Sequence, residues 1–160
     1  MLRIGLISDT HGLLRPEAAR FLRGCDHIVH AGDVGDEAVM DTLHEIAPVT
    51  AVRGNNDVDE WALPLPETQT VRIGGVALFV LHDLKDLAAQ RVPEDVQVVV
   101  CGHSHKPRIF HDPAGRLVIN PGSAGPRRFK LPVSVAELVV ADDRSFHPRL
   151  VDLMQPDQPL

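Results

Sequence analysis

Residues 2–11 read LRIGLISDTH, an apolar run that ends in an acid, a hydroxyl and an imidazole. The run has the length and composition of a buried strand. Similar short runs follow at residues 27–30 and 49–52, and helix-like stretches at residues 15–23 and 35–47 separate the three runs. Because strands that alternate with helices are typical of βαβ units, the first half of the chain predicts a largely parallel sheet.

The second half of the chain is rich in strands. Gly74-Gly75 separates two apolar runs, and Asp112-Pro113-Ala114-Gly115 separates two more, so both segments predict β-hairpins. Residues 58–68 are expected to form a loop. A short helix is predicted at 85–90, and further strands at 70–73, 76–81, 96–101, 108–111, 116–119 and, last, 133–140. The strand at 96–101 is expected to be covered on both faces. Parallel units followed by hairpins indicate an α/β protein with two sheets packed face to face and helices outside.

Length and composition indicate one globular domain. The chain has 160 residues, of which 44% are hydrophobic and 24% charged, so it can bury a core of ordinary size. We expect a single domain at 1–153 and a short C-terminal tail at 154–160. Cys25 and Cys101 lie in apolar stretches without CxxC spacing, which favours buried, reduced thiols.

Charge and hydropathy exclude several classes of partner. The formal charge of −6 opposes broad electrostatic capture of nucleic acid or of an anionic membrane. No apolar run approaches the length of a membrane span, and Asp9 follows the first apolar run too early for a secretory leader. The sequence therefore predicts a cytoplasmic protein.

Polar clusters follow five of the predicted strands. They are Asp9-Thr10-His11, Gly32-Asp33, Gly54-Asn55-Asn56-Asp57, Leu81-His82-Asp83 and Gly102-His103-Ser104-His105. Ligand sites of open α/β sheets assemble at the carboxyl ends of strands, where several loops converge. Each cluster alone is weak, since Asp-x-His and His-x-His pairs occur by chance and an Asn-Asn-Asp segment is also an ordinary turn. Five clusters in order, each at a strand end, are a much stronger pattern.

The residue types in these clusters suit divalent metals. Carboxylate, amide and neutral imidazole groups bind borderline first-row ions, and the lack of thiolates argues against a structural zinc site. Side chains at i and i+2 of an extended chain share one side, so Asp9 can act with His11, and His103 with His105. The candidate ligands exceed what one ion needs, and a two-metal centre with a shared carboxylate would use them all.

The ordered clusters resemble the signature of the calcineurin-like metallophosphoesterases. The later Asn120-Pro121-Gly122-Ser123, with Pro126-Arg127 behind it, is similar to the small YfcE-like phosphodiesterase branch, and the resemblance covers residues 3 to 128. It implies a four-layer α-β-β-α sandwich with two packed mixed β-sheets. It also implies a metal-dependent phosphoesterase in which a hydroxide bridging two divalent ions attacks phosphorus, and a phosphodiesterase is the expected activity.

The resemblance assigns a ligand to each cluster. Asp9, His11 and His105 are expected to hold one ion, Asn55, His82 and His103 the other, and Asp33 to bridge the two. No catalytic residue is expected beyond the bridging hydroxide. Manganese is the expected metal, with iron, zinc, nickel, cobalt and magnesium as alternatives.

Two positions depart from the family pattern. Many members have histidine after the ligand asparagine, where this chain has Asn56. An amide can donate a hydrogen bond to a phosphoryl oxygen but cannot deliver a proton, so we expect weak activity on esters with poor leaving groups. Asp83 replaces a frequent glycine and could accept a hydrogen bond from His82 or displace the loop. Arg127 is a weaker candidate for substrate binding, because a basic cluster is more often a solvated face.

Two other functions remain open from the sequence. The same fold serves as a non-enzymatic scaffold in a eukaryotic retromer subunit, although a scaffold does not need the complete ligand set found here. A small nuclease is the other alternative, and the negative charge and the 4% of aromatic residues argue against binding of long nucleic acid. The expected partner is a small phosphate ester, with no membrane, and a homo-oligomer is compatible with the sequence.

Overall fold

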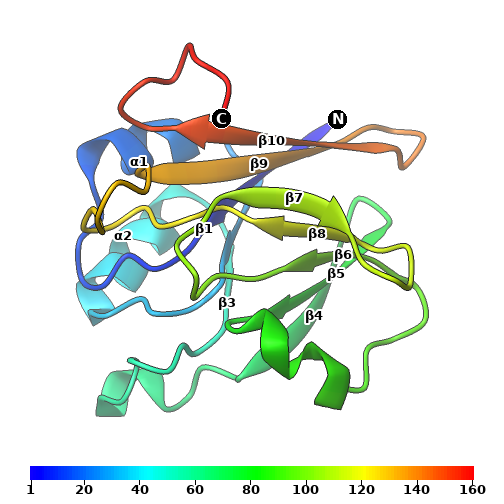
Figure 1. Cartoon of the computed structure of the whole chain (residues 1–160), viewed down its shortest axis with the longest axis horizontal. Helices are drawn as coiled ribbons and strands as arrows, with labels where there is room; N and C mark the ends of the chain where they lie inside the picture. Colours follow the sequence, from blue (N-terminus) through cyan, green and yellow to red (C-terminus); the bar gives the residue numbers. More distant parts are fainter.

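The computed structural model describes residues 1–160, and its first sheet has five strands in the order β10-β9-β1-β2-β3. β1, β2 and β3 are parallel, whereas β9 is antiparallel to β1, and β10 is antiparallel to β9. The strands are β1 (Leu2–Ile7), β2 (His27–His30), β3 (Val49–Ala51), β9 (Ser134–Val140) and β10 (Phe146–Asp152). The sheet therefore contains the parallel unit that the first half of the sequence predicts (Figure 1).

The second sheet is also mixed and has five strands in the order β4-β5-β6-β8-β7. β5, β6 and β8 are parallel, and β4 and β7 are antiparallel edge strands that form the two predicted hairpins. The strands are β4 (Thr68–Ile73), β5 (Val76–Leu81), β6 (Val96–Val100), β7 (Arg108–His111) and β8 (Leu117–Asn120). Both sheets thus combine parallel and antiparallel pairs.

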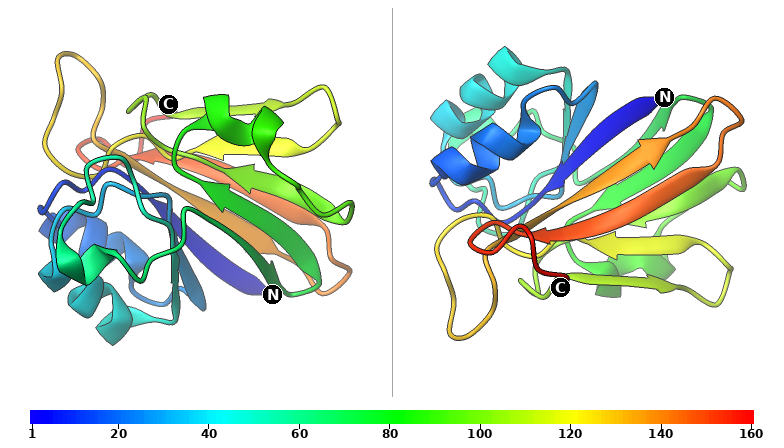
Figure 2. Two further views of the ribbon diagram at one scale, coloured as in Figure 1. Left: turned by 90° about the horizontal axis from the view of Figure 1, so that it is seen from below. Right: turned by 90° about the horizontal axis from the view of Figure 1, so that it is seen from above.

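Alternation along β1 separates the two faces of the first sheet. Ile4 and Leu6 are buried between the sheets, whereas Ile7 packs with the residues buried under the helices. Figure 2 shows the helices and the second sheet on opposite faces of the first sheet. The helices are α1 (Pro16–Leu22) and α2 (Glu37–Ile46), and the outer face of the second sheet is covered by a 3-10 helix, η2 (Leu84–Ala89). The four-layer α-β-β-α architecture is confirmed, with η2 as its thinnest layer.

Two details of the sequence prediction are wrong. β10 follows the strand that we expected to be the last, and it is an edge strand in which Pro148 interrupts the apolar pattern. The strand expected at 96–101 is not covered on both faces, because Gln97 is exposed. Gln97 also has no partner residue in β5, since Ala77 pairs with Val96 and Leu78 with Val98. The short helix predicted at 85–90 is present as η2, and the predicted loop contains the 3-10 helix η1 (Glu60–Ala62).

The fold brings the loops after the parallel strands to a common edge. β1, β2 and β3 end at Ile7, His30 and Ala51, and β5 and β6 end at Leu81 and Val100. Each of the five polar clusters begins within four residues of one of these ends. Both cysteines are buried and unpaired, as expected. The structure contains no helix with the length and apolar character of a membrane span.

Candidate metal centre

One group of side chains gathers around the carboxylate of Asp9. The Nε2 atom of His105 lies 3.3 Å from Asp9 Oδ1, and the Nε2 atom of His11 lies 3.8 Å from the same oxygen. The two imidazole nitrogens are 3.3 Å apart. Ligands about 2.1 Å from one ion lie about 3.0–3.4 Å apart at octahedral or tetrahedral angles. Two of the three distances in this triad match that spacing, and the 3.8 Å between His11 and Asp9 is longer.

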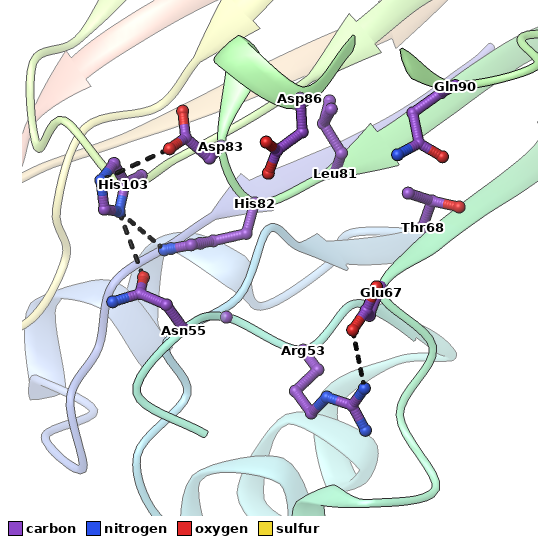
Figure 3. A pocket seen from close by; sticks show the side chains of 11 residues that line it. Arg53, Asn55, Glu67, Thr68, Leu81, His82, Asp83, Asp86, Gln90 and His103 are labelled. Atoms are coloured by element: carbon purple, nitrogen blue, oxygen red, sulfur yellow. Dashed lines mark hydrogen bonds and ion pairs between the residues drawn. The ribbon is translucent and has the colours of Figure 1, made fainter. Parts of the chain in front are cut away.

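A second group is built around Asp33 and His82. His82 Nε2 lies 3.3 Å from Asp33 Oδ2 and 4.0 Å from Asp9 Oδ1. His103 Nδ1 lies 3.3 Å from His82 Nε2 and 3.2 Å from Asn55 Oδ1 (Figure 3). The same Oδ2 atom of Asp33 is 3.8 Å from His11 Nε2, so this carboxylate lies between the two groups. The structure thus brings all seven side chains expected as ligands into one place.

The hydrogen bond of His82 to the backbone determines which of its ring nitrogens can bind a metal. His82 Nδ1 lies 2.7 Å from the carbonyl oxygen of Ala31, which can only accept, so Nδ1 carries a proton. In the neutral ring, Nε2 then directs a lone pair at the carboxylate of Asp33. Two acceptors 3.3 Å apart repel each other unless a proton or a cation lies between them. Either a proton on Nε2 or a divalent ion meets this need, and an ion at this position would take both groups as ligands.

Charge and burial shift the pKa values of the acids and of His82. Burial acts to raise the pKa of Asp33, but the imidazole of His82 and the hydrogen bonds from Asn56 outweigh it and hold the pKa well below its usual value. Burial also acts against the charged form of Asp9, yet the imidazole of His105, the Ser8 hydroxyl and the charge of His82 lower the pKa of this carboxyl. The pKa of His82 is raised, because Asp33 and Asp9 outweigh the burial that opposes its charge. Both carboxylates are thus ionised and available to a cation at neutral pH.

Two buried polar atoms in this cluster lack a hydrogen-bond partner. They are Asp9 Oδ1 and His105 Nδ1. An ionised carboxylate oxygen that is buried without a partner is costly, and a bound cation would remove that cost. Asp9 Oδ1 is also the atom that both groups share, so its position agrees with metal binding.

The backbone is strained at most of these residues. Positive φ angles occur at Asp9 (55°), His11 (46°), Asp33 (56°), His103 (69°) and His105 (63°). Each such residue costs roughly 1–2 kcal/mol, and strain of this kind gathers at functional sites. Only two other residues besides glycine, Phe129 and Arg144, have positive φ angles. The strain is therefore concentrated where the five polar loops meet.

Several buried residues hold the loops in place and were not identified as functional from the sequence. Asp57 accepts hydrogen bonds from the backbone N–H groups of Val34, Gly35 and Gly54, at 2.9–3.1 Å. It thereby ties the loop of Asp33 to the loop of Asn55. The sequence contained a signal for Asp57, since it belongs to the Gly54-Asn55-Asn56-Asp57 cluster, but did not indicate what it binds.

The Asn120-Pro121-Gly122-Ser123 turn braces the histidine loop. Asn120 Nδ2 donates to the carbonyl oxygen of Gly102 at 2.9 Å and to Ser104 Oγ at 3.0 Å. The hydroxyl of Ser123 donates to the carbonyl oxygen of Asp9 at 2.9 Å. The turn therefore connects the loops that carry Asp9 and His103.

His30 supports the same loops from the core. The backbone N–H of Gly32 donates to His30 Nδ1 at 3.1 Å, so the ring proton is on Nε2, which lies 3.0 Å from Thr10 Oγ1. The hydroxyl of Thr10 in turn donates to the carbonyl oxygen of Val34. Full burial lowers the pKa of His30 to about 4, so the ring is neutral.

The structure changes the interpretation of two residues near the centre. Asn56 donates from its backbone N–H to Asp33 Oδ1 at 2.9 Å and from its side chain to Asp33 Oδ2 at 3.0 Å. Asp83 lies 3.6 Å from His103 Nε2 and caps the first turn of η2, so it faces His103 and not His82 (Figure 3). Of the two alternatives for Asp83, the acceptor role towards His82 is wrong, because the Nδ1 proton of His82 goes to the carbonyl oxygen of Ala31.

Three hollows open beside the centre. The first includes Asn55, His82 and His103 (Figure 3), the second opens beyond His103, and the third includes His11, Asn56 and His105 together with Arg127. Arg127 is exposed on the loop that projects from the sandwich, gold in Figure 2. The rings of His11 and His103 are 24% and 43% exposed, whereas those of His82 and His105 are nearly buried. Small molecules can therefore reach the centre from the side of His11 and His103.

Comparison with known proteins agrees with this geometry. The chain is 35% identical to a probable metallophosphoesterase of Methanocaldococcus jannaschii, with 87% of this chain and 76% of that protein covered. The structure resembles that of an archaeal phosphodiesterase, with a TM-score of 0.73 and 22% identity, over 94% of this chain and 100% of the other. It also resembles Entamoeba histolytica Vps29 complexed with Zn²⁺, with a TM-score of 0.71 and 24% identity, over 95% and 99% of the two chains.

The two structural likenesses concern the fold, since both identities are below 25%. The match of the sequence to a family is more specific, because it includes every polar cluster and every strand except β10. Residues 2–143 match the calcineurin-like phosphoesterase superfamily domain. The chain belongs to the calcineurin-like phosphoesterase superfamily.

Proposed function

We propose that this protein hydrolyses small phosphodiesters with two divalent ions held at the candidate metal centre. Membership of the superfamily supports a metal-dependent phosphoesterase, and the proposal adds the number of ions and the class of ester. The observation that carries it is the pair of facing acceptors, His82 Nε2 and Asp33 Oδ2, beside the Asp9 triad. Groups placed in this way need positive charge between them, and two ions would provide it on both sides of Asp33.

Each side chain has one role in the proposal. Asp9, His11 and His105 would hold one ion, Asn55, His82 and His103 would hold the other, and Asp33 would be shared by the two. When bound, such ions polarise phosphoryl oxygens and lower the pKa of water so that hydroxide forms near neutral pH. Manganese is our first choice, because the carboxylate and amide oxygens suit it and thiolate is lacking, and zinc, which imidazole suits, is the second.

The surrounding residues keep these donors in position. The Ala31 carbonyl fixes the tautomer of His82, and the Ser8 hydroxyl donates to Asp9 Oδ2 at 2.6 Å. Asn56 donates to both oxygens of Asp33, from its backbone N–H and from one N–H of its side chain, so the amide is held beside the carboxylate and its second N–H is available to a phosphoryl oxygen. None of these groups can protonate a departing alkoxide, so activated esters are the best substrates to test first.

Replacing Asp33 tests the proposal. We expect Asp33→Asn to lower metal-dependent hydrolysis of bis(p-nitrophenyl) phosphate by about 100-fold or more, because the shared anionic donor is lost. Metal content by mass spectrometry should fall in parallel, while the circular dichroism spectrum stays that of the folded protein. The matched control is Asp41→Asn, which removes an exposed carboxylate on α2 and should leave both values unchanged.

Two results would contradict the proposal. Retention of most of the rate by Asp33→Asn would exclude a shared carboxylate at the reacting centre. Absence of metal-dependent hydrolysis in the native protein, with mono- and diesters and with each first-row ion added back, would favour the scaffold alternative.

A further inference from the structure

The hollows around the metal centre differ in charge. The hollow drawn in Figure 3 is acidic, with Glu67, Asp83 and Asp86 in its lining, and its only arginine, Arg53, is paired with Glu67 at 3.1 Å. The hollow beyond His103, here called the basic pocket, has Lys85, Lys106, Arg108 and Arg128 in its lining and a single acid, Asp83. A negatively charged group is therefore repelled from one side of His103 and attracted to the other.

The four cations of the basic pocket lack carboxylate partners. Five arginines outside the basic-pocket set form ion pairs with carboxylates: Arg3, Arg53, Arg72, Arg116 and Arg149. None of the pocket cations makes such a pair, although the chain carries six more acids than bases. Unpaired cations that gather in one hollow of an acidic protein form a local site for an anion.

The basic pocket also has room and an apolar lining. Its volume is about 530 Å³, and Leu84, Cys101 and Phe110 provide apolar surface. The guanidinium of Arg108 lies 4.2 Å from the ring centroid of Phe110, which orients it on the pocket wall. Hydrogen bonds from Asn120 to Gly102 and Ser104 hold the part of the rim that follows β6. The pocket can therefore take a short organic arm that ends in an anion.

We propose that the basic pocket is a specificity subsite for phosphoesters in which one arm bears a second phosphate. The proposal rests on the function proposed above and adds the substrate class to it. The ester phosphorus would lie at the metal centre, and the arm would pass His103, which lines both the centre and the pocket. The terminal phosphate would then meet Lys85, Lys106, Arg108 and Arg128.

A pair of substrates with one leaving group isolates this effect. Ethyl p-nitrophenyl phosphate has a neutral arm, and 2-phosphoethyl p-nitrophenyl phosphate has the same ester with a phosphate on the arm. Both release p-nitrophenolate, so the chemical step is matched. We expect kcat/KM to be higher by roughly tenfold for the phosphorylated arm, mainly through KM, and this advantage to shrink as salt is added.

Charge reversal locates the effect in the pocket. Lys85→Glu with Arg108→Glu should remove the advantage and leave kcat/KM for the neutral arm within about twofold of the native value. Neither residue adjoins a proposed ligand. The matched control is Arg20→Glu with Arg23→Glu, which changes the net charge equally at exposed positions around the C-terminal end of α1 and should keep the advantage.

Equilibrium binding gives a readout that does not need turnover. The products, ethyl phosphate and 2-phosphoethyl phosphate, can be titrated by calorimetry into the metal-loaded protein. The second should bind more tightly, and only Lys85→Glu with Arg108→Glu should abolish the difference.

The outcomes separate this proposal from the proposed function. Hydrolysis of both esters with no preference, or a preference that survives reversal of Lys85 and Arg108, would overturn the subsite and leave the phosphodiesterase intact. Failure of the native protein to hydrolyse either ester would overturn both.

Discussion

Asn56 is the residue with the greatest consequence for the choice of ester. Its side-chain amide donates to Asp33 and cannot deliver a proton to a poor leaving group. The signature that the sequence resembles has histidine at this position. The identity of one side chain could therefore separate activated from unactivated esters.

Replacing Asn56 by histidine tests this idea. We expect Asn56→His to raise kcat/KM for methyl phenyl phosphate by about tenfold more than for methyl p-nitrophenyl phosphate, because only the poorer leaving group needs the acid. Steady-state rates with both esters measure the ratio. Equal changes for the two esters would contradict the role of position 56 in proton supply.

The ligand residues could be predicted individually, because each follows an apolar run and belongs to a residue type with metal chemistry. The structure brings Asp9, His11, Asp33, Asn55, His82, His103 and His105 together, although their roles as ligands remain a proposal. The partners of Asp57 and Asn120 could not be predicted. They depend on contacts between loops that are far apart in the sequence, and a carboxylate or amide in a turn does not indicate which backbone groups it will meet.

At the level of elements, the loops after β2 and β3 form one unit through Asp57. Its buried carboxylate satisfies three backbone N–H groups from both loops. Gly54 allows the close approach, since a Cβ atom there would overlap the backbone nitrogen and the carboxylate of Asp33. The position of Asp33 therefore depends on residues beyond its own loop.

Removing the Asp57 carboxylate should loosen this unit. We expect Asp57→Ala to lower the free energy of unfolding by about 3 kcal/mol or more, because it leaves buried N–H groups unpaired. Urea unfolding measures the loss, and metal affinity should weaken in the same variant. Asp59→Ala, which removes an exposed carboxylate two residues away, should change both by little. Equal stability of the two variants would contradict the role of Asp57.

Most strands could be predicted from their apolar runs, and the exceptions have a physical cause. β10 is exposed at alternate residues and contains Pro148, so its sequence lacks the continuous apolar run of a central strand. The bulge at Gln97 depends on the pairing of β6 with β5, which a local pattern does not reveal. Edge strands and register are thus set by neighbours in space.

For the whole molecule, the buried His30 predicts how stability depends on pH. Its pKa in the folded protein is about 4, below the ordinary value of 6.5, so between these values the unfolded chain binds a proton that the folded chain does not. The free energy of unfolding that the neutral His30 contributes should therefore be fully present above pH 6.5. It should be lost as the pH decreases towards 4, by about 3 kcal/mol in total.

Urea unfolding of the EDTA-treated protein at several pH values tests this prediction. His30→Gln, which keeps a donor for Thr10 without a titrating ring, should remove most of the dependence between about pH 4.5 and 6.5. The pKa of His82 is raised above 6.5, so the stability that its protonation contributes is lost as the pH increases above this range. The same pH slope in the native protein and the variant would show that His30 is not the responsible group.

The single domain at 1–153, the cytoplasmic location and a small phosphate ester as the partner remain predictions from the sequence. The α-β-β-α architecture and the family, by contrast, are established by the two mixed sheets and by the match over residues 2–143. The sandwich acts as a rigid support, because strands from both sheets end beside one cluster of charges. Function therefore depends on whether that cluster holds ions.

Anomalous diffraction from crystals grown with Mn²⁺ tests this most directly. Two peaks about 3.5–4 Å apart on either side of the Asp33 carboxylate, one beside Asp9, His11 and His105 and the other beside Asn55, His82 and His103, are the predicted result. A map without peaks between these side chains, at a manganese concentration that saturates the protein in solution, would contradict the proposed centre.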